Sequence, residues 1–215
     1  MTAPTRRRLT AEERRAGILD AALAVFSARG YHPSSIDDIA REAGISKALI
    51  YEHFDSKQGL YADLLERNAN ELFERLAAAV AGVGVESGAD RLAAGLDAFF
   101  GFVEERREAW RILFRDVADP ETAAVLDRIL SQVTAVVADL IAQDPGVRAL
   151  DQDETQGDQA IGLLARMLVG AVQSVANWWA DHREVSREQI VEMVMDFAWL
   201  GLERLRRGER WAPGG

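Results

Sequence analysis

The most informative part of this chain is residues 35–57, which read SIDDIAREAGISKALIYEHFDSK. Ile36 and Ile39 recur at helical spacing, while Ser35 is placed to cap this helix and Gly44 to end it. A second short helix follows the glycine turn at once. Two short helices joined by such a turn are typical of a helix-turn-helix, whose second helix enters the major groove of DNA. A plain helical corner of an all-α protein is the alternative.

The second helix of the pair begins after Ser46 and has a face that does not suit plain solvent. At about 100° per residue, Ile50 and Phe54 point together into a small core. Several other residues must look outward, where Leu49 and Tyr51 would gain nothing from water. Against DNA, apolar side chains suit thymine methyl groups, a lysine suits guanine acceptors, and polar groups suit phosphates. The predicted base contacts are Lys47, Ala48 and Leu49, and the other predicted DNA-binding residues are Ser35, Ser46, Tyr51, His53 and Lys57.

Three consecutive arginines, Arg6, Arg7 and Arg8, precede the first helix. As a basic arm they would lie in the minor groove or along the DNA backbone. A solvated tail is the alternative.

Helical periodicity continues on both sides of the central stretch. Before it, an apolar stripe from Ile18 to Phe26 follows a capping-box sequence at Thr10–Glu13. After it, the pattern predicts helices at about 57–81, 89–105, 108–117, 120–143, 156–182 and 187–206. No alternating run supports a strand. The expected fold is therefore all-α, with about nine helices.

Charge is divided unevenly along the chain. The 215 residues hold 25 Lys and Arg against 35 Asp and Glu, for a net charge of −10. Residues 1–57 hold nine basic and eight acidic residues, whereas the rest of the chain holds 16 and 27. This asymmetry predicts a small, locally basic DNA-binding domain at 1–55 and a large acidic body at 56–215. The helix at about 57–81 would connect the two.

Composition excludes several other classes of protein. The absence of Cys rules out disulfide scaffolds, Cys-ligated metals and thiol catalysis. Three scattered His leave little for a metal site, so no metal or cofactor is expected. No window approaches 18 uninterrupted apolar residues, and the basic N-terminus lacks the apolar segment of a secretory signal. We therefore expect a cytoplasmic protein that does not enter the membrane.

Residues 35–57 closely resemble the DNA-binding signature of the tetracycline-repressor (TetR) family of bacterial regulators. The matching positions, at the spacing of that family, are Ile39-Ala40, Ala43-Gly44-Ile45-Ser46, Tyr51, Phe54 and Lys57. Residues 10–80 look like the family throughout, whereas the body matches only in length, helicity and the ending Trp199-Leu-Gly-Leu202. The resemblance implies operator contacts through the outward residues named above, a homodimer, and a small-molecule effector that most often releases a repressor from its operator.

Two features depart from the family pattern. Leu49 stands where the family often has Thr, so an apolar contact replaces a hydroxyl contact. Asp37 and Asp38 open the first helix of the pair with two acids, which complement the helix dipole but are expected to repel nearby phosphate.

The last two predicted helices, at about 156–182 and 187–206, are rich in apolar and small residues, and the apolar arc of the first extends beyond one face. A helix of this kind is normally buried on both sides. Pairing the two helices with those of a second copy would form a four-helix dimer bundle. Burial of both faces within one chain is the alternative.

An effector pocket is predicted from the aromatic residues of the body, because pockets are commonly lined by aromatics with a few polar groups. Trp178 and Trp179 cannot face one direction on a helix, so one of them is expected in the core and the other toward a cavity or a partner. Ordinary core packing is the alternative for each aromatic side chain. The candidate pocket residues are Asp97, Phe100, Trp110, Arg111, Phe114, Gln173, Asn177 and Trp178.

Two other classes of function compete with the regulator. An enzyme would need a catalytic group, and the pair Asp181 and His182 has the pattern of an ordinary polar helix end, without a phosphate loop, metal spacing or nucleophile elbow elsewhere. A helical adaptor without sequence-specific DNA binding would not need Lys47 and Lys57. A ligand-responsive, sequence-specific transcriptional regulator is therefore the leading prediction.

Overall fold

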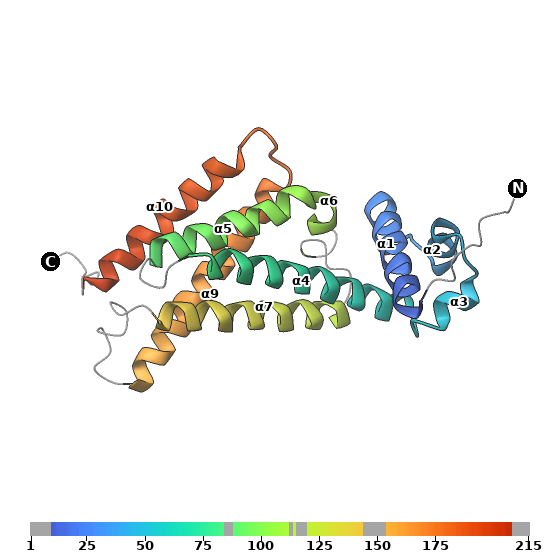
Figure 1. Ribbon diagram of the computed structural model, residues 1–215, viewed down its shortest axis with the longest axis horizontal. Helices are drawn as coiled ribbons and strands as arrows, with labels where there is room; N and C mark the ends of the chain where they lie inside the picture. The colour runs from blue at the N-terminus through green and yellow to red at the C-terminus, as the bar shows by residue number, and fades with distance from the viewer. Residues whose placement is uncertain (1–9, 84–87, 112–113, 115–119, 144–153, 208–215) are drawn as a thin grey trace, which may run out of the picture.

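The computed structural model describes residues 10–83, 88–111, 114, 120–143 and 154–207. Within these residues the regular structure is helical and includes no strand, which confirms the all-α prediction (Figure 1). The helices are α1 (Ala11–Arg29), α2 (Ile36–Ala43), α3 (Lys47–Tyr51), α4 (Lys57–Ala81), α5 (Gly88–Glu105), α6 (Arg107–Trp110), α7 (Pro120–Ala142), α9 (Glu154–Trp179) and α10 (Arg187–Arg206).

Helices α1, α2 and α3 form a small head, whose buried side chains belong to one hydrophobic core with those of α4. Ile39, Ile50 and Phe54 are buried against Phe26 of α1, as their spacing predicts. Gly44 ends α2 in the left-handed region at φ +65°, a conformation that glycine adopts without steric cost. This turn sets α3 at an angle to α2 and thereby fixes which residues of α3 point away from the core.

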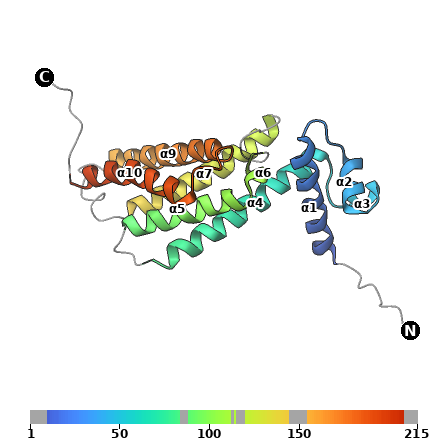
Figure 2. The same ribbon diagram turned by 90° about the horizontal axis from the view of Figure 1, so that it is seen from above.

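The long helix α4 runs out of the head and becomes part of the body, so that the two parts share one rigid element (Figure 1). In the body α4 packs against α5 and α7, while α9 packs against α7 and α10 packs against α5. Seen from above, α9 and α10 run along the same side of the body, opposite α4 (Figure 2). The helix pair predicted to dimerise therefore lies on one face.

Two ion pairs fasten α1 to α4. Arg15 of α1 pairs with Asp63 of α4, and Arg67 of α4 pairs with Asp20 of α1 at 2.8 Å. Arg67 also donates to the carbonyl oxygen of Ala16. These contacts join the head to α4 at three points along the two helices.

The structure differs from the predicted helix bounds in three places. The predicted helix at 156–182 is α9, which ends at Trp179 because the chain turns at Ala180. The helix after Ser46 is only five residues long. Of the predicted helix at 108–117, α6 covers Arg107–Trp110, and much of the remainder lies outside the described residues. Arg6, Arg7 and Arg8 also lie outside them.

By length and composition alone, Gln159–Trp179 of α9 is the one helix among the described residues that could cross a membrane. Its mean hydropathy is 1.4, and 17% of the tested window is buried. However, α9 packs along α7, and core helices of soluble proteins pass the same test.

Candidate nucleic-acid interface and effector region

Helix α3 presents the predicted DNA-binding side chains away from the core of the head. Ser46 caps the helix by accepting a hydrogen bond from the backbone N–H of Leu49 at 3.2 Å. Ile50 is fully buried, so the helix is held by its inward side. Lys47, Ala48 and Tyr51 are exposed, whereas Leu49 and His53 are half-buried. The structure thus leaves three of these side chains exposed and two partly covered.

Lys47, at the start of α3, is held by an acid from α2. Its Nζ lies 2.8 Å from Oδ2 of Asp37, and this hydrogen bond with its attendant charge raises the pKa of the lysine. Lys47 is therefore a cation at neutral pH. Asp37 was expected to repel phosphate, and its pairing with Lys47 was not apparent from the sequence because the two residues are ten positions apart across the Gly44 turn.

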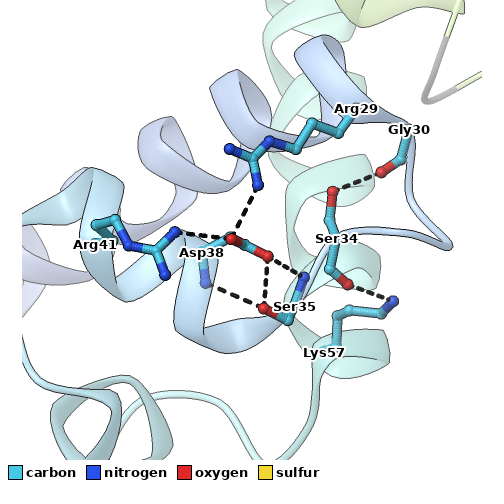
Figure 3. A network of polar contacts seen from close by, with 7 residues as sticks. All are labelled: Arg29, Gly30, Ser34, Ser35, Asp38, Arg41 and Lys57. Carbon is cyan, nitrogen blue, oxygen red and sulfur yellow. Dashed lines mark hydrogen bonds and ion pairs between the residues drawn. The ribbon is translucent and has the colours of Figure 1, made fainter.

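Asp38 is the centre of a polar network that ties α2 to α1 (Figure 3). Its carboxylate accepts from the backbone N–H and the hydroxyl of Ser35, at 3.1 and 2.6 Å, and completes a capping box. It also pairs with Arg41 at 2.9 Å and with Arg29 at 3.0 Å. The hydrogen bonds from Ser35, with those from Arg41 and the charge of Arg29, lower the pKa of Asp38 to about 2. The Ser35-x-x-Asp38 spacing is a local signal of this capping box.

Lys57 is engaged by the turn between α1 and α2. Its Nζ donates to the carbonyl oxygen of Ser34 at 3.0 Å (Figure 3). It also donates to the carbonyl oxygen of Tyr31 at 3.0 Å and lies 4.2 Å from the centre of the Tyr31 ring. Ser35 likewise uses its hydroxyl within the head. A phosphate contact from either residue is still a prediction, and Lys57 has in addition a clear structural role.

In the body, the aromatic side chains of Phe99 on α5 and of Phe114 lie against Trp110 of α6. The ring of Trp110 stacks on Phe114 with centroids 4.7 Å apart, and Phe99 meets it edge to face at 5.4 Å. Its Nε1 donates to Oδ1 of Asn177 on α9 at 3.0 Å. Four of the eight candidate pocket residues belong to this region, with Phe100 buried beside it against Trp179 at 5.6 Å.

A small cleft of about 160 Å³ lies next to this aromatic cluster, and its walls come from α6 and the turn after α9. Arg107 is fixed there, because it donates to the carbonyl oxygen of Trp179 at 2.6 Å and lies 4.1 Å from the centre of the Trp179 ring. Sequence reasoning identified Arg111 but missed the other basic residues, since no local pattern joins α6 to the end of α9. The cleft is lined by Arg107, Arg111, Ala180, Asp181 and Arg183.

The other candidate pocket residues lie elsewhere. Asp97 is exposed on α5 and pairs with Arg187 of α10 at 3.0 Å. Trp178 is 48% exposed and stacks on His182, whereas Trp179 is fully buried, so the two tryptophans do point in different directions. Gln173 is half-buried one turn before Asn177. Among the described residues, no three His, Asp or Glu side chains gather as metal ligands.

Helices α9 and α10 leave a row of large apolar side chains uncovered. The residues recur at helical spacing on each helix, and Phe197 is 76% exposed. Between them on α9 lie the small residues Gly170 and Ser174, which would allow close approach of another helix. The exposed row consists of Leu163, Met167 and Trp178 on α9 and of Met193, Phe197 and Leu200 on α10.

A capped recognition helix with outward basic and small side chains, carried by a three-helix head, defines a helix-turn-helix DNA-binding protein. Comparison with known families gives the particular kind. The model described as "Bacterial regulatory proteins, tetR family" matches residues 18–64, and that described as "Tetracyclin repressor-like, C-terminal domain" matches residues 89–201. The chain belongs to the TetR family and is a DNA-binding transcriptional regulator with a ligand-binding C-terminal domain. This family consists of regulators rather than enzymes.

Relatives resemble the chain over nearly its whole length. The HTH-type transcriptional activator FasR of Mycolicibacterium smegmatis is 34% identical over 200 residues, which cover 92% of this chain and 87% of FasR. The crystal structure of a TetR-like transcriptional regulator from Rhodococcus sp. RHA1 is 31% identical, covers 91% of this chain and 99% of its own, and gives a TM-score of 0.70. FadR from Bacillus subtilis, solved in complex with stearoyl-CoA, shares the fold at 18% identity, with coverage of 91% and 99% and a TM-score of 0.69.

Proposed function

We propose that this chain is a dimeric, cytoplasmic transcriptional regulator that reads an operator with α3 and responds to an acyl-CoA thioester bound in its body. The DNA-binding part of this proposal rests on one observation. Lys47, Ala48 and Tyr51 are exposed on a helix whose inward residue, Ile50, is fully buried. In this proposal residues 1–55 read DNA and residues 56–215 bind the effector and dimerise.

The dimer is supported by the uncovered apolar row on α9 and α10. Large exposed apolar side chains gathered on one face of a protein mark an interaction site. A two-fold pairing of α9 and α10 with those of a second copy buries the row against itself, because a two-fold interface uses the same patch on both subunits. Such a dimer presents two α3 helices, which matches two half-sites about one DNA turn apart.

The effector class is supported by the chemistry of the body and by its relatives. A fatty acyl thioester needs an apolar site for its chain and cations for its phosphates. The aromatic cluster around Trp110 lies next to a cleft whose lining includes three arginines, Arg107, Arg111 and Arg183, and one acid, Asp181. The structure of FadR that this fold resembles holds stearoyl-CoA. The effector would favour one of two states of α4 and the head, since only differential binding shifts such an equilibrium.

Whether the chain represses or activates transcription stays open to test. Repression is the prediction from the family's usual mode of action, whereas the relative FasR is called an activator. The test uses fluorescence anisotropy of the full-length chain on DNA beside its own gene, with excess non-specific competitor and with the salt concentration varied. We expect competitor-resistant binding by two chains per site, and a changed affinity with stearoyl-CoA but not with an equal mixture of stearate and CoA. Weak binding that salt abolishes on this duplex and on duplexes selected from random DNA would favour an adaptor instead.

The effector site has its own test within that assay. Arg111→Ala is expected to weaken the response to stearoyl-CoA while leaving DNA affinity in its absence unchanged. Arg166→Ala is the matched control, because Arg166 is an exposed arginine of α9 that does not line the cleft. An equal response in both variants would show that the phosphates bind elsewhere.

A further inference from the structure

Asp37 and Lys47 form one ion pair on the surface that α3 presents outward, with Nζ and Oδ2 2.8 Å apart. Their side chains are 59% and 47% exposed, so both remain within reach of a docked duplex. We propose that Asp37 is a specificity-determining residue, which holds the ammonium group of Lys47 until a base of the correct operator offers a better acceptor. This inference rests on the proposed function, because it requires that Lys47 reads DNA.

The stability of α2 does not explain why an acid stands at position 37. Its neighbour Asp38 already completes the capping box with Ser35 and holds Arg29 and Arg41. The ion pair with Lys47 is the only one that Asp37 makes with a described residue. An acid in the first turn also favours the helix dipole, but that benefit does not depend on a lysine ten residues later.

Because of the ion pair with Asp37, contact between Lys47 and DNA depends on the base sequence of the duplex. Free of Asp37, a lysine on this surface would contact a phosphate of any duplex and strengthen binding to all sequences alike. With Asp37 in place, a phosphate must compete with a carboxylate that is already bound and that itself repels the DNA backbone. The N7 and O6 atoms of guanine accept two hydrogen bonds from a lysine without such repulsion.

Discrimination depends on a difference between affinities, and it increases when wrong partners are penalised more than the right one. An exposed ion pair is weak in water, so the operator can exchange it at small cost. Non-specific DNA has the required guanine at this position only by chance. Asp37 therefore lowers non-specific binding more than it lowers specific binding.

The test compares the full-length chain with Asp37→Asn on two duplexes, an operator selected from random DNA by the wild type and a scrambled duplex of equal length. We expect Asp37→Asn to bind the scrambled duplex severalfold more tightly, with a salt slope steeper by about one unit because one more phosphate is neutralised. Operator affinity should change much less, so that the ratio of the two affinities falls.

Glu42→Gln is the matched control, because it removes one exposed acid from the same helix without touching Lys47. A double-mutant cycle with Lys47→Gln adds a second control, because Asp37→Asn should lose its effect on the ratio when the lysine is absent. An equal effect of Asp37→Asn and Glu42→Gln, or a full effect without Lys47, would overturn the inference. If the wild type selected no operator at all, the proposed function itself would fail.

Discussion

Arg187 at the start of α10 crosses directly over Gly101 of α5, and its Nη1 lies 3.0 Å from the position that a Cβ atom on Gly101 would occupy. On either side the guanidinium meets acids of the same helix, Asp97 at 3.0 Å and Glu104 at 3.7 Å. Because Gly101 has no side chain, Arg187 can cross α5 at this point, and its ion pairs then hold α10 against α5. This contact positions one of the two helices of the proposed dimer face.

The first prediction concerns this close approach. Replacing glycine by alanine inside a helix normally stabilises it by about 0.8–1 kcal/mol. Gly95→Ala should show this gain, because the nearest atom to its new Cβ, on Val80, is 3.8 Å away. Gly101→Ala should gain little or nothing, since Arg187 must move from its acids. Urea denaturation of both variants measures the difference, and an equal gain would show that Arg187 adapts without loss.

How far the sequence predicts this fold depends on the distance over which each feature is encoded. The caps at Thr10 and Ser35 each follow from four consecutive residues, and the structure confirms them. The Gly44 turn is equally local. In contrast, the bond from Arg107 to Trp179 joins residues 72 positions apart, and no periodicity within a helix reveals it.

The same reasoning applies to the candidate sites. The inward side of α3 follows from its spacing, so the outward side chains were predictable. The partners of Lys47 and Lys57 were not, because each lies across a turn or in another element. For the effector region, the sequence pattern around an aromatic residue such as Phe100 is the same whether the residue lies in the core or lines a pocket. Only the tertiary packing distinguishes the two.

The second prediction concerns the acid stability of the head. The pKa of Asp38 is lowered to about 2 from 3.8, so its ionised form stabilises the folded state. That stability is fully present above about pH 4 and is lost as the pH falls toward 2. Asp38→Asn should be less stable than the wild type at neutral pH, and the difference should shrink between pH 4 and 2. Urea denaturation across this pH range, followed by circular dichroism, measures the free energy of unfolding of both proteins. Glu42→Gln, which removes another acid of α2, is the control. A stability difference between Asp38→Asn and the wild type that does not change with pH would contradict the prediction.

The third prediction concerns the hydrogen bond between Trp110 and Asn177, with donor and acceptor 3.0 Å apart. Asn177→Leu removes the acceptor of a buried indole N–H and should lower the free energy of unfolding by about 1–3 kcal/mol. Gln173→Leu, one turn earlier on α9, is the control for an added apolar side chain. Thermal denaturation with and without stearoyl-CoA measures both variants. Equal stability of the two variants would show that the indole finds another acceptor.

The fourth prediction separates the structural and DNA-binding roles of Lys57. Its Nζ donates hydrogen bonds to the carbonyl oxygens of Tyr31 and Ser34, so Lys57→Ala should destabilise the chain by about 1.5–3 kcal/mol, as expected for hydrogen bonds from a charged donor.

If Lys57 also holds a phosphate, Lys57→Ala should weaken binding to all duplexes alike and reduce the salt slope by about one unit. Lys47→Ala should instead alter which sequence is preferred. Identical behaviour of the two variants across operator sequences would show that the division into base and phosphate contacts is wrong.

The last prediction concerns the apolar row of α9 and α10. Phe197 is 76% exposed in the single chain, and in the proposed dimer it lies at the interface. Phe197→Arg would place a charge there without an acid partner, and burial of an unpaired charge is costly. We expect this variant to be monomeric at micromolar concentration by light scattering, and to bind the operator far more weakly because a monomer presents one recognition helix. Val136→Arg replaces an exposed apolar residue of α7, 52% accessible and outside the row, and should remain dimeric. A dimeric Phe197→Arg together with a monomeric Val136→Arg would move the interface to α7.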